Sequence, residues 1–213
     1  MRVEARMVTY EEQLNRDLDW ALREGSMHFE EKNAVHKTLQ KITRRLDQLG
    51  IPYVVVGALA MFLHGYRRFT EDVDLLVTAD GLKEIHAQLE GLGYVPPFAG
   101  SKHLRDAEFG VRVEFLVTGD YPGDGKPKPI SFPDPKAASV EINGISCLQL
   151  EAVIEIKLAS GMTNPGRLKD LGDVQEMIRV LGLPREMADR LNPFVQEKYK
   201  ELWDAVHSNP LEP

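Results

Sequence analysis

The sequence predicts an α/β (α+β) fold in which helices flank a mixed β-sheet and a helical part follows at the C-terminus. Three observations support this fold class. Short runs of β-branched residues alternate with amphipathic helical patterns over the first two thirds of the chain. An Asn-Gly pair then indicates a β-hairpin, and every later pattern is helical. Strands that alternate with helices and then give way to helices indicate a sheet with helices packed on it.

The N-terminal segment predicts two helices. Thr9 and Glu12 have the spacing of a capping box, and the apolar residues behind them follow one helical face until the Gly-Ser pair at 25–26 ends the helix. A second apolar stripe predicts a helix from about residue 30 to residue 49. The first helix precedes the segment that carries the chemistry. We therefore expect it either to dock or dimerise with a partner or to pack on the protein's own body.

The central segment supplies the predicted strands. Its expected elements are a strand at 53–57, a short helix at 58–64, a strand at 72–77, a helix over 82–92, a strand at 110–117 and a hairpin around Asn143 and Gly144. The stretch at 119–135 is dense in Gly and Pro, which predicts a loop or ordered coil. Further helices are expected near 150–160, 168–181 and 193–206.

This order of elements suggests three parts: an N-terminal helical extension at 1–26, a core at 27–148 and a helical C-terminal part at 149–213. No apolar run approaches the roughly 20 residues that cross a bilayer, and the first residues lack the apolar core of a secretory signal. Cys147 is the single cysteine, which excludes an internal disulfide and a cysteine-based zinc site. We therefore expect a cytoplasmic protein that has no membrane partner.

The net charge of −7 argues against broad, non-specific binding to DNA or other nucleic acid, because such affinity comes from phosphate neutralisation. Short basic runs at 44–45, 67–68, 102–105 and 126–128 could still gather in space. Each run by itself is more simply explained as solvated surface charge.

Asp72 and Asp74 are the strongest candidates for chemistry. Alternate side chains of a strand share a face, so the two carboxylates point the same way, while Val73, Leu75 and Val77 point to the opposite, buried side. Carboxylates placed side by side repel each other unless a positive charge lies between them. A divalent cation such as Mg²⁺ supplies that charge, held by one or two carboxylates together with phosphate oxygens of a substrate. The pair therefore predicts a metal site.

Glu114 would complete the site if its strand pairs beside the strand that bears Asp72 and Asp74. An acid without a partner is costly to bury, and Glu114 shares its strand face with Arg112. Gly57 lies where a strand ends and a helix opens, a place where backbone N–H groups can cradle phosphate without obstruction by a side chain. Each feature alone has a plain structural explanation, but their combination and order are specific.

The segment VVGALAMFLHGYRRFTEDVDLLV at 55–77 resembles the core motif of the polymerase beta-like nucleotidyltransferase superfamily. Within that superfamily it is most similar to the AbiEii-type toxin nucleotidyltransferases and their relatives. The motif of that group is a Gly pair, a short helix, an Arg-x-Thr element and Asp-x-Asp, which correspond here to Gly57, Arg68, Thr70, Asp72 and Asp74. Ala58 departs from the pattern, since the group usually has a second glycine or small polar residue at that position.

The resemblance covers roughly residues 30–182 and includes later motifs at 155–160 and 167–177, matched through Lys157, Lys169, Asp170 and Asp173. It implies that residues 27–148 form a nucleotidyltransferase core with Mg²⁺ (or Mn²⁺) on Asp72, Asp74 and Glu114. The residues implied to hold the NTP are Gly57, Ala58, Arg68, Thr70, Lys157 and Lys169. Lys157 and Asp170 join the three acids as catalytic candidates, although Asp170 could equally serve as an acid at a helix start. Asp173 is expected to be structural.

The implied reaction is transfer of a nucleoside monophosphate from an NTP, such as ATP, with release of pyrophosphate. The implied acceptor is RNA, for example a tRNA end, or a protein side chain, as in toxin–antitoxin systems, where an antitoxin would be a partner. A small molecule of the aminoglycoside kind is the next option. Two other classes stay open: a non-catalytic nucleotide-binding or interaction module that retains the fold, and a structural scaffold with solvated acids.

Overall fold

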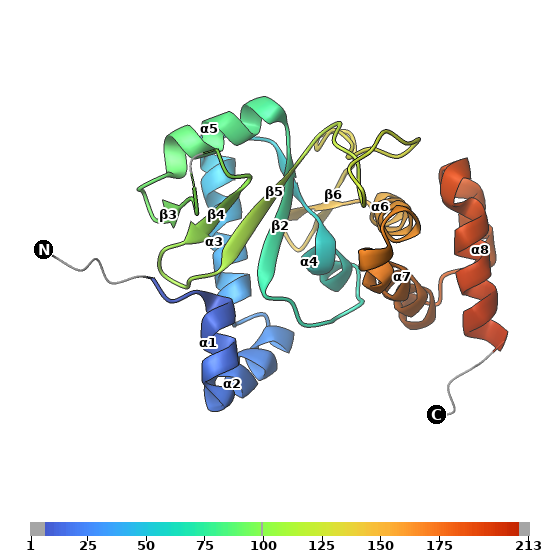
Figure 1. The fold of residues 1–213 in the computed structure, drawn as a ribbon, viewed down its shortest axis with the longest axis horizontal. Coiled ribbons are helices and arrows are strands. Elements are labelled where there is room, and N and C mark those ends of the chain that lie inside the picture. Colours follow the sequence, from blue (N-terminus) through green and yellow to red (C-terminus); the bar gives the residue numbers. More distant parts are fainter. Residues whose placement is uncertain (1–6, 99, 209–213) are drawn as a thin grey trace, which may run out of the picture.

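A computed structural model describes residues 7–98 and 100–208 of the chain. Its strands are β1 (Tyr53–Val55), β2 (Asp72–Val77), β3 (Tyr94–Val95), β4 (His103–Asp106), β5 (Arg112–Val117), β6 (Ser139–Ile142) and β7 (Ile145–Leu148). Its helices are α1 (Tyr10–Arg16), α2 (Leu18–Phe29), α3 (Ala34–Leu49), α4 (Gly57–Leu63), α5 (Ala79–Leu89), α6 (Leu150–Thr163), α7 (Leu168–Leu181) and α8 (Pro193–Ser208), with short 3₁₀ helices at Pro165–Arg167 and Arg185–Arg190. The predicted mixed α/β fold with a helical C-terminal part is confirmed (Figure 1).

The described strands form one mixed sheet in the order β3-β4-β5-β2-β1-β7-β6. At its centre β2 runs parallel to β5 and antiparallel to β1. The register of the parallel pair aligns Asp72 with Arg112 and Asp74 with Glu114. Because directly paired residues project to the same face of a sheet, this register brings the acids of two distant segments together.

Two hydrophobic cores lie on the two faces of the sheet. Val73, Leu75 and Phe115 are fully buried on the face that α3 and α5 cover. Leu76 and the apolar residues of α6, α7 and α8 form the core of the other face. Figure 1 shows α6 and α7 between the sheet and α8. The C-terminal helices therefore share a core with the sheet, and the acids lie on the face that these helices approach.

The N-terminal helix boundaries differ from the prediction. The predicted single helix ending at 25–26 is instead two helices, α1 and α2, and the Gly-Ser pair lies inside α2. Asp17 separates them, because its carboxylate accepts a hydrogen bond from the backbone N–H of Trp20 and caps α2. The helix continues past the pair to Phe29, and within it the buried Glu24 accepts a hydrogen bond from the hydroxyl of Tyr10, 3.0 Å away.

The start of the next helix also differs. α3 begins at Ala34 and not near residue 30, because Asn33 caps it through the backbone N–H of His36. The capping box at Thr9 and Glu12 is confirmed, since each side chain accepts from the other residue's backbone N–H.

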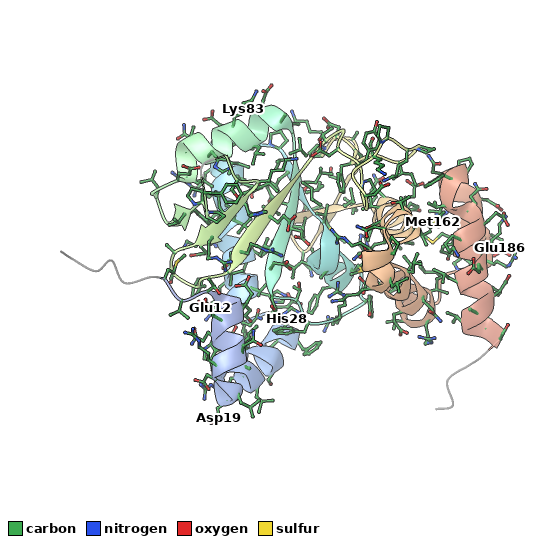
Figure 2. All side chains as sticks on the ribbon, in the orientation of Figure 1. Glu12, Asp19, His28, Lys83, Met162 and Glu186 are labelled. Carbon is green, nitrogen blue, oxygen red and sulfur yellow. The ribbon has the colours of Figure 1, made fainter. Side chains whose placement is uncertain are left out.

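Described contacts attach α1 and α2 to the body of the protein. The backbone N–H of Tyr10 donates to the carbonyl of Gly110 at 3.1 Å. His28, labelled in Figure 2, places Nε2 3.0 Å from the carbonyl oxygen of Arg68. The outer face of α2 leaves Leu18 and Leu22 exposed. Residues 1–6 of the predicted extension and 209–213 of the predicted C-terminal part lie outside the described residues, and the three-part division stays a prediction.

The hairpin and the last three predicted helices are confirmed. Asn143 and Gly144 both have positive φ, 52° and 75°, as a tight two-residue hairpin turn between β6 and β7 requires. The sequence prediction missed β3 and β4, because one is two residues long and the other, HLRD, lacks a run of β-branched residues. None of the helices in the described part of the chain combines the length and apolarity of a membrane span.

Candidate active site

Three carboxylates gather on two neighbouring strands. Asp72 and Asp74 project from β2, and Glu114 projects from β5, which lies directly beside it. One carboxylate oxygen from each of the three lies within 4.8 Å of the others. Val73 and Leu75 are fully buried on the opposite face, as the alternation of side chains along a strand predicts. The structure thus brings together the three acids that the sequence singled out.

Gly57 opens α4 directly against this cluster. Its φ of +63° lies in the left-handed region that favours glycine. A Cβ atom built on Gly57 would lie 2.1 Å from Oδ2 of Asp74, so no larger residue fits without displacing that carboxylate. The predicted glycine turn therefore has a steric cause that involves the acid pair itself.

Asp72 is held by one neighbour on each of its two oxygens. The hydroxyl of Thr70 donates to Oδ1 at 2.8 Å, and Nη2 of Arg112 lies 2.6 Å from Oδ2. The same Arg112 nitrogen is 3.7 Å from Oε2 of Glu114. Thr70 is buried and supports Asp72 without lining the cavity described below.

Asp74 is the acid whose protonation responds most to its surroundings. Burial, together with the negative charges of Asp72 and Glu114, raises the pKa of Asp74 to about 7. The positive charges of Lys157 and Arg112 act in the opposite direction but do not cancel this rise. A carboxyl group in this position would be favoured in its ionised form by a bound cation.

A buried ionic network lies between α6 and α7, beside the acids. Nζ of Lys157 donates to Asp170 at 2.6 Å and to Asp173 at 2.8 Å. The hydroxyl of Ser160 donates to the second oxygen of Asp170 at 2.6 Å. Burial by itself would raise the pKa of Asp170, but Lys157, Ser160 and Arg167 together lower it below the usual value. The network favours the ionised form of Asp170 and fixes Lys157 at the cavity wall.

The remaining predicted ligands do not line the cavity. Arg68 pairs with Asp173, with Nε 3.0 Å from Oδ1, which ties the segment before β2 to α7. Ala58 is buried inside α4. Lys169 is exposed on the outer side of α7. Asp173 is 3% exposed and pairs with both Arg68 and Lys157, and the structural role expected for it stays a prediction.

A cavity of about 360 Å³ lies over the acids. Of the residues that the sequence singled out, those lining it are Gly57, Asp72, Asp74, Glu114, Lys157 and Asp170. The loop at 119–135 supplies Pro122, Gly123 and Phe132 to the wall. A Cβ atom on Gly123 would lie 2.3 Å from Oγ1 of Thr163, so this glycine allows the loop to pack directly on α6.

Sequence reasoning did not assign roles to several cavity residues. Arg112 was visible as a neighbour of Glu114 on one strand face, but its approach to Asp72 depends on the pairing of β2 with β5. Ser160 and Arg167 also line the cavity. Both lie inside the motif segments at 155–160 and 167–177, but they received no role there, because they reach the site only through the packing of α6 and the turn before α7.

The donor set fits a divalent metal ion. All three clustered ligands are carboxylate oxygens, which are hard donors that suit Mg²⁺ and Mn²⁺. In the described part of the chain no histidine or cysteine joins this cluster, so its donors differ from the nitrogen and sulfur ligands of typical zinc sites.

The mixed sheet with flanking helices matches the fold of solved nucleotidyltransferase structures, and the three acids lie on adjacent strands of it beside a glycine turn. The similarity is to the antibiotic-resistance factor ANT(2″)-Ia. Its solution structure is 18% identical and matches with a TM-score of 0.52 over 80% of this chain and 96% of that chain. Its crystal structure with adenylyl-2″-tobramycin, also 18% identical, matches with a TM-score of 0.50 over 81% and 96% of the two chains.

A putative nucleotidyltransferase from Thermotoga maritima is a looser match. It is 21% identical, with a TM-score of 0.43 over 67% of this chain and 91% of that chain. No protein-family model and no curated protein matches the sequence. The likeness to ANT(2″)-Ia establishes the fold, and the narrower resemblance to the AbiEii-type group stays a prediction.

Proposed function

We propose that the protein transfers a nucleoside monophosphate from an NTP to an acceptor hydroxyl and releases pyrophosphate. The observation that carries this proposal is the convergence of Asp72, Asp74 and Glu114 within 4.8 Å, in a cavity whose wall includes Gly57. Proteins that catalyse phosphoryl-type transfer contribute mainly position and charge. The cavity offers fixed carboxylates, fixed cations and a close approach to backbone at one place.

Each group has a role that follows from its position. Asp72, Asp74 and Glu114 would hold Mg²⁺ or Mn²⁺, which when bound neutralises phosphate charge and activates a hydroxyl nucleophile. Gly57 presents backbone without a side chain and would lie against the phosphates. Lys157 lies on the same wall and its charge favours the ionised form of Asp74. Asp170 orients Lys157 through their 2.6 Å hydrogen bond.

The transfer breaks the bond between the α-phosphorus and the pyrophosphate oxygen and forms a bond from that phosphorus to the acceptor oxygen. The hydroxyl proton leaves the acceptor in the process. The carboxylates that line the cavity are the groups placed to receive it, and Glu114, with 33% of its side chain exposed, is more open than Asp72 at 23%.

We propose RNA, for example a tRNA end, or a protein side chain as the acceptor, following the resemblance of residues 55–77 to AbiEii-type toxins. An antitoxin would then be a partner. A small-molecule hydroxyl is the second candidate. It is favoured by the net charge of −7, which disfavours a phosphate-rich acceptor, and by the likeness to ANT(2″)-Ia, whose crystal structure contains adenylyl-2″-tobramycin.

The test is label transfer from each of the four NTPs, labelled at the α-phosphate, in the presence of Mg²⁺. The acceptors are total RNA, a protein extract and a panel of aminoglycosides. We expect the wild type to label one of these classes and Asp72→Ala to label none. Asp80→Ala is the matched control, because Asp80 is an exposed acid on α5 outside the cavity, and it should behave as wild type.

Two results would contradict the proposal. If the wild type binds NTP but labels no acceptor class with any nucleotide, the protein is a non-catalytic nucleotide-binding module. If Mg²⁺ binding is undetectable and Asp72→Ala changes neither NTP binding nor transfer, the acids are a structural feature of a scaffold. Circular dichroism of each variant shows that the compared proteins are folded.

A further inference from the structure

Arg112 occupies the place between two carboxylates of the proposed metal site. Its Nη2 lies 2.6 Å from Oδ2 of Asp72 and 3.7 Å from Oε2 of Glu114. The parallel register pairs Arg112 directly with Asp72, so the guanidinium reaches from β5 across to β2 while it stays beside Glu114 on its own strand. The guanidinium therefore places a positive charge between these two acids.

The two partners of Asp72 differ in how they would respond to a metal ion. Thr70 is neutral, and its hydroxyl can donate to Oδ1 while the carboxylate binds a cation elsewhere. Arg112 is positively charged and bonds Oδ2, so a cation at that oxygen would be repelled by the guanidinium. Binding of a metal ion by Asp72 and Glu114 together therefore requires Arg112 to move.

The other surroundings of Arg112 permit such a movement. Its Nε is buried and has no hydrogen-bond partner among the described residues. Its side chain is 38% exposed, and it lines the cavity. Among the described residues, Arg112 forms ion pairs only with Asp72 and Glu114, so no acid outside the site holds the guanidinium in place.

We propose that Arg112 holds the cation position in the metal-free protein and exchanges Asp72 for a phosphate group when NTP and the divalent ion enter. The planar guanidinium fork matches carboxylate and phosphate oxygens alike, which makes this exchange of partners chemically reasonable. The proposal rests on the proposed function, because it assumes a divalent ion at Asp72 and Glu114. It assigns Arg112 to contact with the triphosphate, a role that no sequence motif indicated.

The proposal has a thermodynamic consequence. Without nucleotide, the metal ion competes with Arg112 for Asp72, so metal binding is weakened. Nucleotide offers the guanidinium a new partner, so it strengthens metal binding by more than its own chelation of the ion. Coupling of this kind is reciprocal, so the metal ion strengthens nucleotide binding by the same factor.

The experiment measures Mn²⁺ affinity from the electron paramagnetic resonance signal of free Mn²⁺, with and without an α,β-non-hydrolysable NTP analogue. The variants are Arg112→Gln and the control Arg167→Gln. The control removes an equal charge from the cavity wall, 3.9 Å from Asp170. Without nucleotide, we expect Arg112→Gln to bind Mn²⁺ at least about tenfold more tightly than wild type, or about 1.4 kcal/mol. Arg167→Gln should change the affinity by less than about threefold.

The analogue should raise Mn²⁺ affinity less in Arg112→Gln than in wild type, because only direct chelation remains. The proposal would be overturned if Arg112→Gln and the wild type had equal Mn²⁺ affinities without nucleotide. It would also be overturned if Arg112→Gln and Arg167→Gln gained Mn²⁺ affinity equally, because that result would show a general charge effect. Absence of Mn²⁺ binding in every protein, with and without analogue, would instead overturn the proposed function. If Arg112→Gln does not fold, Arg112→Lys replaces it, with a smaller increase expected because the charge remains.

Discussion

Gly57 and Asp74 approach each other so closely that a Cβ atom on Gly57 would lie 2.1 Å from Oδ2 of Asp74. The contact joins the first residue of α4 to the middle of β2, and the φ of +63° at Gly57 independently favours glycine. Backbone conformation and site geometry therefore both require glycine at this position.

We expect Gly57→Ala to destabilise the protein by about 1–3 kcal/mol, because it combines backbone strain with a clash. It should also abolish nucleotide transfer, since the methyl group displaces Asp74. Urea denaturation and label transfer measure the two effects. Gly25→Ala is the control: Gly25 lies inside α2 with nothing within 4 Å of a new Cβ atom. The free energy of unfolding of Gly25→Ala should rise by roughly 0.5–1 kcal/mol. If Gly57→Ala proved as stable as Gly25→Ala, the steric argument would be contradicted.

Asp74→Asn should stabilise the metal-free protein in a pH-dependent way. Burial and neighbouring acids raise the pKa of Asp74 from its ordinary value of 3.8 to about 7. Ionised Asp74 is therefore less favourable in the folded than in the unfolded protein, and its cost is absent below about pH 4 and complete above about pH 7.

At pH 8 with EDTA we expect Asp74→Asn to raise Tm by roughly 2–4 °C, which corresponds to about 1 kcal/mol. The increase should shrink towards pH 5. Mg²⁺ should stabilise the wild type more than the variant. Thermal melts at both pH values test this, with Asp80→Asn as an exposed control that should show no such gain. A Tm increase that is the same at pH 5 and pH 8 would disagree with a raised pKa.

Lys157→Met should cost about 3–5 kcal/mol, because it removes the nearest counter-charge of the buried Asp170 and leaves the buried Asp173 with Arg68 as its remaining charged partner. Lys157 contacts Asp170 at 2.6 Å and Asp173 at 2.8 Å, and these two residues are only 6% and 3% exposed. Adding Asp170→Asn to the variant should recover part of the loss. Chemical denaturation measures both effects.

The control for Lys157 is Lys83→Met, which breaks the exposed ion pair between Lys83 and Asp80 and should change stability little. In the wild type, Lys157 contributes most to lowering the pKa of Asp170. The stability from this pair is therefore present above the unfolded pKa and lost as pH falls through the folded one. Lys157→Met should accordingly lose less stability than wild type on acidification, and a parallel loss would argue against the network.

The buried histidine pair predicts acid sensitivity. His28 and His36 have ring centroids 4.8 Å apart, and burial, followed by the charge of His28, lowers the pKa of His36 to about 4 from 6.5. Burial also lowers the pKa of His28. The folded state thus binds fewer protons than the unfolded state between these values, and stability declines as pH falls from about 6.5 towards 4.

Each histidine can contribute at most about 1.4 kcal/mol per pH unit to this decline. His36→Gln should make the decline shallower between pH 6.5 and pH 4.5, as measured by urea denaturation at several pH values. His207→Gln changes an exposed histidine and should leave the slope as in wild type. An unchanged slope in His36→Gln would show that other groups control acid stability.

Local pattern was a reliable guide to elements but less so to their boundaries. The strand at 72–77 and the hairpin at 143–144 follow from alternation and from one turn pair, and both were predicted. The division of the N-terminal helix at Asp17 was missed, because the apolar pattern continues across residue 17 and hides the cap that Asp17 provides for α2. β4 was missed because its place in the sheet comes from pairing with β5 and not from its composition.

The sequence by itself determined that Asp72 and Asp74 share one strand face opposite Val73 and Leu75, because side-chain alternation is a property of each strand alone. Tertiary structure alone decided that β5 lies parallel to β2. This pairing brings Glu114 beside Asp72 and Asp74 and places the guanidinium of Arg112 between Asp72 and Glu114. Tertiary structure also decided that Arg68 pairs with Asp173, 105 positions away. The reason is physical: strand register and buried ion pairs arise from contacts between segments far apart in the chain, whose geometry no local periodicity encodes.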